Sequence, residues 1–134
     1  MTQLLPRGIR NNNPGNIRYD GTPWRGLAAP QSDGAFCRFS DAKYGIRAMA
    51  KVILNYEKMH GLNTVAGIIS RWAPPIENNT AAYVAAVARD LGCAASAPID
   101  VGGNLPTLCR AIVKHENGQC PYSDAEIEQG IALC

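Results

Sequence analysis

Glu116 is the residue whose type and position favour chemistry most clearly, within segment 109–118, which has the sequence CRAIVKHENG. On a helix, Glu116 lies four residues after Ile112 and eight after Leu108, so its carboxyl falls on the apolar side of the last turn. Gly118 then ends the helix. Partial burial and the negative end of the helix dipole both favour an uncharged carboxyl. Such a group is suited to general-acid catalysis at a glycosidic bond. The plainer alternative is a solvated glutamate at the helix edge.

Two further segments have compositions that suit a carbohydrate. Segment 10–19, RNNNPGNIRY, combines a Pro-Gly turn with four asparagines, whose amides can bind sugar hydroxyls and N-acetyl groups. Segment 71–80, RWAPPIENNT, places a tryptophan and two prolines beside Glu77 and two amides, a mixture that can line a groove. The alternatives are a plain polar turn for the first segment and, for the second, a core Trp72 followed by a helix cap.

Composition excludes several other classes of function. The two histidines, His60 and His115, are far apart in sequence and belong to no spaced Cys/His set, so we expect no metal and no cofactor. The net charge of +2, from 13 basic and 11 acidic residues, is too balanced for a nucleic-acid partner. No apolar run is long enough for a membrane span or a signal peptide.

Apolar periodicity and capping residues predict the helices that must position these groups. The expected helices are 41–60 after a Ser40 cap, 65–73 after Thr64, 79–91, 105–117 after Asn104, and 124–132 after the Ser123 capping box. A chain of 134 residues forms one domain, and we expect a mainly α class with a loop-rich part, 1–39, and a helical part, 40–134. The one strand candidate is 35–39.

The five cysteines are an odd number, so a monomer keeps at least one free thiol. Cys120 and Cys134 flank a helix of about 15 Å and are too far apart to pair with each other. A bridge between Cys93 and Cys109 is one candidate, and the alternative is that Cys109 is a plain buried thiol.

Several segments together resemble the lysozyme-like fold of lytic transglycosylases and goose-type lysozymes. Segment 44–49, YGIRAM, is similar to the start of a family helix, and segment 82–87, AYVAAV, is similar to the helix whose tyrosine contributes to the active site. RWAP at 71–74 stands where the family has A-Y-N-A-G-P. AIVKHENG at 111–118 resembles the segment of the catalytic glutamate, but it comes downstream, as in a permuted arrangement. GNIR at 15–18 is similar to the G-L-M-Q loop.

This resemblance, which extends to small phage lysins and virion-associated lytic proteins, implies an enzyme that cleaves peptidoglycan. The scissile bond is the β-1,4 bond between N-acetylmuramic acid and N-acetylglucosamine, and Glu116 is the general acid and base. The implied substrate-binding residues are Asn13, Asn16, Arg18, Trp72, Asn78 and Tyr83. A muramidase would need a second carboxylate, for which Glu77 is the first candidate and Asp20 and Asp41 follow. The family pattern that this sequence resembles has one catalytic glutamate, which favours a lytic transglycosylase over a muramidase.

Two alternatives remain, the first from another class of function and the second with the same chemistry. One is a non-catalytic wall-binding or virion structural protein with the same fold. The other is an antibacterial effector muramidase, which would have an immunity or inhibitor protein as partner. In each case we expect a monomer made in the cytoplasm without a signal peptide, with peptidoglycan in the periplasm as its target.

Overall fold

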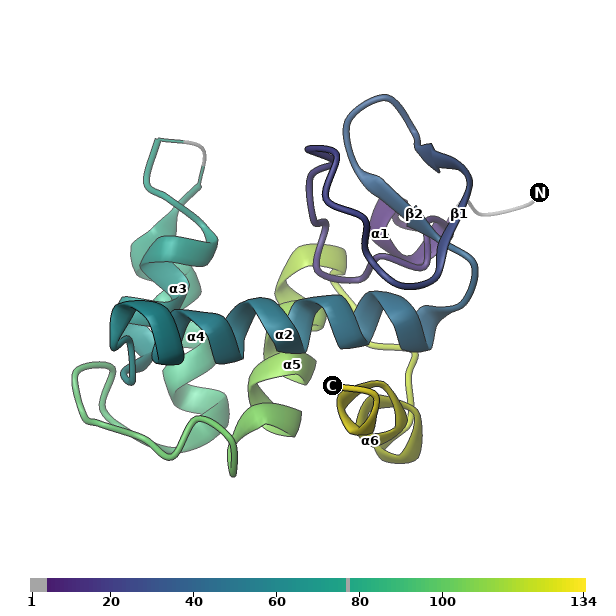
Figure 1. Ribbon diagram of the computed structural model, residues 1–134. Coiled ribbons are helices and arrows are strands. Elements are labelled where there is room, and N and C mark those ends of the chain that lie inside the picture. The colour runs from purple at the N-terminus through teal and green to yellow at the C-terminus, as the bar shows by residue number, and fades with distance from the viewer. Residues whose placement is uncertain (1–4, 77) are drawn as a thin grey trace.

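Eight short elements follow one another in the computed structural model, which describes residues 5–76 and 78–134 (Figure 1). They are α1 (Arg7–Arg10), β1 (Leu27–Ser32), β2 (Cys37–Phe39), α2 (Ala42–His60), α3 (Val65–Trp72), α4 (Thr80–Leu91), α5 (Leu105–Asn117) and α6 (Asp124–Ala132). The mainly α class predicted from the sequence is therefore confirmed.

The long helix α2 runs across the middle of the molecule, and the other elements pack around it (Figure 1). Its apolar stripe is fully buried at Ile46, Met49 and Ile53. The predicted Ser40 cap is wrong by one residue, because the Asp41 side chain accepts the hydrogen bond from the Lys43 N–H. The helix ends where Gly61 adopts the left-handed conformation.

Helices α3 to α6 complete the main core. Helix α5 packs one whole face into this core. Its buried side chains include Leu108, Cys109 and Ile112, the stripe that the sequence predicted. Asn104 precedes α5 as expected, but its side chain makes no capping hydrogen bond. Helix α6 begins with the predicted capping box, in which Ser123 and Glu126 exchange side-chain and backbone hydrogen bonds.

The N-terminal part has more regular structure than the sequence predicted. Strands β1 and β2 form an antiparallel hairpin with Leu27 opposite Phe39, and β2 lies inside the predicted strand candidate. The hairpin packs with α1 above one end of α2, while α3 and the following loop rise above the other end (Figure 1). Cys37, Phe39 and Ala48 form a second small core beneath the hairpin.

All five cysteines are free thiols, so the Cys93–Cys109 bridge is not formed. Cys109 instead lies on the buried face of α5, in the main core, with no exposed surface. This burial, with a smaller contribution from the neighbouring Cys134, raises the pKa of the Cys109 thiol to about 12. Cys109 therefore behaves as a buried apolar side chain.

Candidate functional site

Glu116 lies in the last turn of α5, and two donors from distant parts of the chain hold its carboxyl. The Asn16 side chain donates to Oε1 at 3.1 Å, and the Tyr83 hydroxyl donates to Oε2 at 2.9 Å. Each oxygen thus has its own donor, one from the N-terminal part and one from α4. These two donors fix the direction of the carboxyl. Glu116 is only half-buried, so one side of it remains open.

Tyr83 is almost fully buried, with 1% of its surface exposed, although its hydroxyl reaches Glu116. Burial first, and then the charge and hydrogen bond of Glu116, raise the pKa of the Tyr83 phenol far above its usual range. The phenol therefore stays protonated and remains a donor. The exposed His115 ring stacks on Tyr83, with 3.7 Å between ring centroids. Sequence reasoning assigned Tyr83 to the substrate, but in the structure it positions Glu116.

A cleft of about 540 Å³ opens beside Glu116, within the size range of ligand pockets. The described residues that line it are Gly15, Asn16, Ile17, Arg18, Phe36, Val52, Tyr56, Trp72, Ala73, Pro74, Asn78 and Glu116. They come from the N-terminal part, from α2, from the end of α3 with its following loop, and from α5. The cleft thus lies between the hairpin half and the α3 half of the molecule, which stand apart above α2 in Figure 1.

Asn16 reaches the cleft because the backbone adopts an uncommon conformation there. Its φ is +51°, in the left-handed region that asparagine tolerates better than most residues. The Asn16 Oδ1 is buried without a hydrogen-bond partner among the described residues, and so is Oδ1 of Asn117. Both oxygens crowd Gly8, where an added methyl group would lie 2.7 Å from each of them. A side chain at position 8 would therefore push Asn16 away from Glu116.

The structure corrects the prediction that Asn13 binds the substrate. Its side chain has no exposed surface, and all of its hydrogen-bonding groups have backbone partners. Nδ2 donates to the carbonyls of Ile17 and Cys37, while Oδ1 accepts from the Ile17 N–H. Asn13 therefore ties the 13–17 turn to the hairpin and has nothing to offer a ligand.

Trp72, the last residue of α3, and Asn78, in the loop that follows, both line the cleft. Trp72 is partly buried and contributes a wall, and Gly15 allows it to come close, since a methyl group there would lie 2.8 Å from its ring. Asn78 is exposed, and its Nδ2 donates to the Pro74 carbonyl across the loop. Glu77, the predicted second carboxylate, lies outside the described residues.

The two further carboxylate candidates do not line the cleft. Asp20 accepts hydrogen bonds from the hydroxyl and the N–H of Thr22, which lower the pKa of its carboxyl. Asp41 caps α2. Among the described lining residues, Glu116 therefore carries the only carboxyl group.

Sequence reasoning missed two aromatic residues that line the cleft, Phe36 and Tyr56. Tyr56 follows Val52 by four residues on the edge of the α2 stripe, and this spacing was the available signal. Burial raises the pKa of the Tyr56 phenol, which stays neutral. Phe36 carried no such signal, because the hairpin that places it was not predicted. With Trp72, these rings give the cleft three apolar surfaces.

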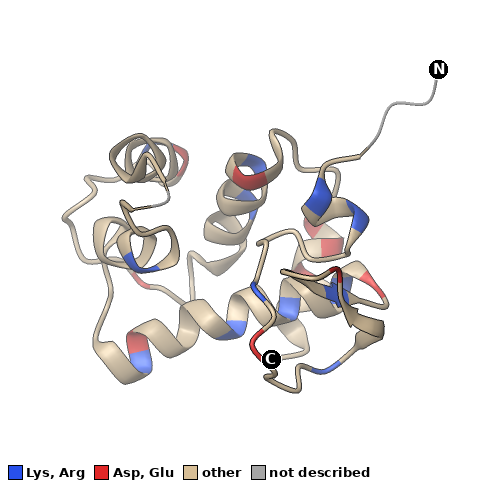
Figure 2. Cartoon of the chain, turned by 90° about the horizontal axis from the view of Figure 1, so that it is seen from above, with Lys and Arg blue, Asp and Glu red and all other residues tan. Residues whose placement is uncertain are grey.

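Charged residues are spread over the described part of the molecule. Figure 2 shows basic and acidic segments dispersed over the helices and the hairpin, in agreement with the small net charge. The described part of the chain holds no cluster of three or more His, Cys, Asp or Glu that would bind a metal. No helix within residues 5–76 and 78–134 is long and apolar enough to cross a bilayer.

The fold and site define a small, mainly α-helical domain in which the described residues place the Glu116 carboxyl in an aromatic cleft between two halves. No protein-family model matches the sequence. The chain is 37% identical over 127 residues to Protein P5 of Pseudoalteromonas phage PM2, covering 92% of this chain and 79% of that protein. The chain therefore belongs to the same family as this bacteriophage protein.

Proposed function

We propose that this protein cleaves the β-1,4 bond between N-acetylmuramic acid and N-acetylglucosamine in peptidoglycan, with Glu116 as general acid and base. The observation that carries the proposal is the Glu116 carboxyl, held by two donors and open to a cleft with three aromatic residues. Aromatic faces suit the apolar faces of sugar rings, and the amides of Asn16 and Asn78 suit their polar substituents. A phage protein as relative is in keeping with a target in the bacterial wall.

In the proposed reaction, protonated Glu116 gives its proton to the glycosidic oxygen as the bond to C1 breaks. The 6-hydroxyl oxygen of the muramyl residue then bonds to C1 and returns its proton to Glu116. The product is a 1,6-anhydro sugar, and no water is consumed. The single catalytic glutamate of the family that the sequence resembles favours this route over hydrolysis, which commonly uses a carboxyl pair.

Product analysis tests both the activity and the route. Purified protein is incubated with isolated sacculi in ¹⁸O-labelled water, and the released fragments are analysed by mass spectrometry. We expect 1,6-anhydro ends without ¹⁸O. Labelled reducing ends would replace the transglycosylase with a muramidase. Binding to sacculi without fragment release would contradict catalysis and leave the wall-binding alternative.

A further inference from the structure

The cleft is lined by one acidic and one basic side chain among the described residues. Glu116 contributes a carboxyl group and Arg18 contributes a guanidinium. The rest of the described lining consists of aromatic rings, aliphatic groups and amides. A ligand that fills the cleft therefore meets one guanidinium, in addition to the carboxyl that would act on it.

Arg18 is held at the cleft by Phe36. The two residues form an isolated antiparallel backbone bridge, and the Arg18 guanidinium carbon lies 5.1 Å from the centroid of the Phe36 ring. A guanidinium over the face of an aromatic ring is attracted to it, and this attraction helps to hold Arg18 at the cleft. With five N–H donors, the guanidinium can bind a carboxylate with two of them while others serve a protein partner.

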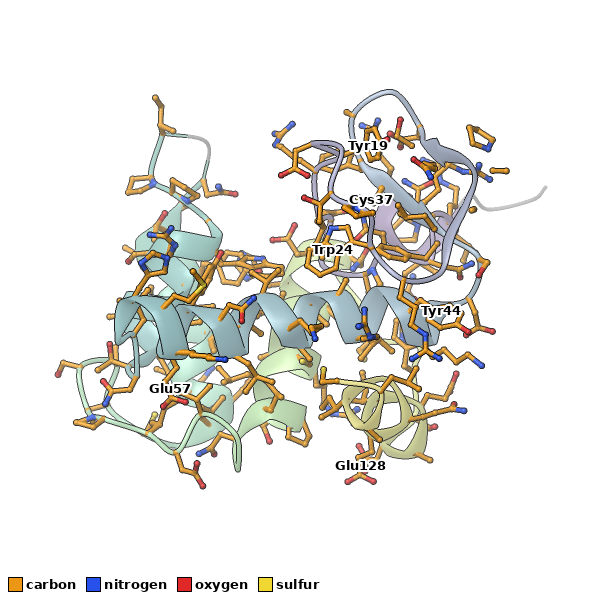
Figure 3. The ribbon with its side chains drawn as sticks, in the orientation of Figure 1. Tyr19, Trp24, Cys37, Tyr44, Glu57 and Glu128 are labelled. Atoms are coloured by element: carbon orange, nitrogen blue, oxygen red, sulfur yellow. The ribbon has the colours of Figure 1, made fainter. Side chains whose placement is uncertain are left out.

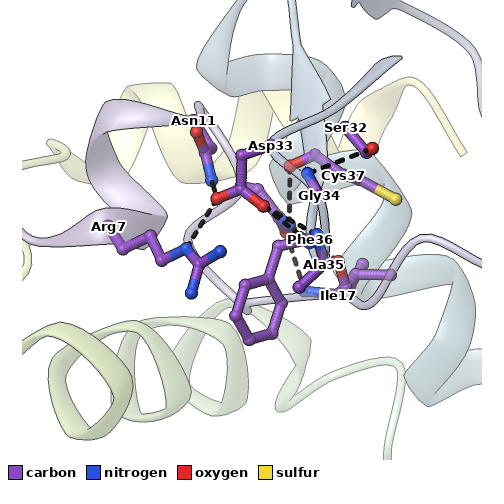
Figure 4. A network of polar contacts seen from close by, with 10 residues as sticks. Arg7, Asn11, Ile17, Ser32, Asp33, Gly34, Ala35, Phe36 and Cys37 are labelled. Atoms are coloured by element: carbon purple, nitrogen blue, oxygen red, sulfur yellow. Dashed lines mark hydrogen bonds and ion pairs between the residues drawn. The ribbon is translucent and has the colours of Figure 1, made fainter. Parts of the chain in front are cut away.

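Asp33, three residues before Phe36, holds the loop that carries the Phe36 ring (Figure 4). Its Oδ2 accepts from Arg7 Nε at 2.6 Å and from Asn11 Nδ2 at 2.9 Å, and its Oδ1 accepts from the Phe36 N–H at 2.9 Å. These bonds, with that of Arg7 the strongest, hold the pKa of the Asp33 carboxyl well below its usual range. The Asp33 network thus fixes the loop that carries Phe36, and with it the ring on which Arg18 lies.

We infer that Arg18 makes the cleft selective for glycans that carry a carboxylate over neutral amino-sugar polymers such as chitin. The inference rests on the proposed function, since it assumes that the cleft binds a glycan. A peptidoglycan strand offers the anion from two sources, the lactyl group of a peptide-free muramyl residue or a carboxyl of the stem peptide. A guanidinium binds both in the same way.

The test compares three probes: neutral chitotetraose, a peptide-free tetrasaccharide of alternating N-acetylglucosamine and N-acetylmuramic acid, and the same tetrasaccharide with its stem peptides. Binding is measured by calorimetry at low salt, with Glu116→Gln in every protein to prevent cleavage. Arg18→Gln should weaken binding of the acidic probes about tenfold and that of chitotetraose less than about threefold. Arg18→Lys, which keeps the charge without the planar fork, should lie between.

Arg25→Gln is the matched control, because Arg25 also stacks on an aromatic ring, that of Tyr44, and neither residue lines the cleft. It should leave all three affinities unchanged. The acidic probe that loses more affinity identifies the source of the anion. Equal weakening of all three probes by Arg18→Gln would overturn the role of Arg18 alone. So would equal affinities of the Glu116→Gln protein with intact Arg18 for neutral and acidic probes. Failure of all three probes to bind would overturn the proposed function as well.

Discussion

Tyr83 and Tyr122 form a natural pair for testing whether Glu116 is held as the structure describes. Both side chains are more than nine-tenths buried, with 1% and 8% of their surfaces exposed. The Tyr83 hydroxyl donates to Glu116, whereas the Tyr122 hydroxyl has no hydrogen-bond partner among the described residues. Replacement by phenylalanine thus removes a hydrogen bond at position 83 and an unsatisfied buried group at position 122.

The two replacements should change stability in opposite directions. Removing a donor so that a buried acceptor is left unsatisfied costs about 1–3 kcal/mol, and water can partly replace the hydroxyl at half-buried Glu116, so we expect Tyr83→Phe to lose about 1–2 kcal/mol. Tyr122→Phe relieves a desolvation cost, and we expect between no change and a gain of about 1 kcal/mol. At about 3–5 °C per kcal/mol for a domain of this size, the melting temperatures should differ by at least about 3 °C.

Thermal unfolding followed by circular dichroism, together with fragment release from sacculi, measures both consequences. Tyr83→Phe should also slow release about tenfold, because Glu116 loses one of the two groups that orient it. Tyr122→Phe should release fragments at the wild-type rate. A Tyr83→Phe protein that melts at the wild-type temperature, or a Tyr122→Phe protein that is equally destabilised, would refute this reasoning.

Two further predictions concern residues that support the site from a distance. Gly8→Ala should lose about 1–3 kcal/mol in urea unfolding, because its methyl group would lie 2.7 Å from the Asn16 and Asn117 oxygens. Gly102→Ala should change little, because its methyl group would lie at an ordinary contact distance of 3.9 Å from an Asp100 oxygen. Equal midpoints for the two variants would contradict the crowding at Gly8. Arg7→Gln should lower the melting temperature at pH 7, since Arg7 helps to hold the pKa of Asp33 below its unfolded value. That stabilisation is present above about pH 4 and is lost as the pH falls further, so the difference from wild type should narrow in acid. A difference that is constant from pH 7 to pH 2 would contradict the ion pair as its source.

The helical part could be predicted because its signals are local. Apolar residues recur at helical spacing on α2 and α5, and the caps at Thr64 and Ser123 form as expected. The position of Glu116 on the apolar stripe followed from the same periodicity, and the structure brings Asn16 to it across 100 residues of chain. Spacing alone gave no indication that Asn16 would contact Glu116.

The N-terminal part could not be predicted to the same extent, because long-range side-chain bonds stabilise it. Asp33 joins α1 to the hairpin, and Asn13 joins the 13–17 turn to β2. Composition singled out the four asparagines of segment 10–19 together, but it does not indicate which of them faces the cleft. Of the four, Asn16 lines the cleft, whereas Asn11, Asn12 and Asn13 bond to the protein itself. Phe36 was missed for the same reason, since the hairpin places it.

The most direct test of the central claim is the rate at which Glu116→Gln releases fragments from sacculi. The variant should fold, because Tyr83 can still donate to the new amide oxygen and the partnerless Oδ1 of Asn16 can turn to accept from its N–H. The control is Glu57→Gln, at an exposed position on the side of α2 away from the cleft (Figure 3). If Glu116 is the general acid, Glu116→Gln releases fragments at least about a hundredfold more slowly than wild type, and Glu57→Gln matches wild type. Equal rates for Glu116→Gln and wild type would contradict the account.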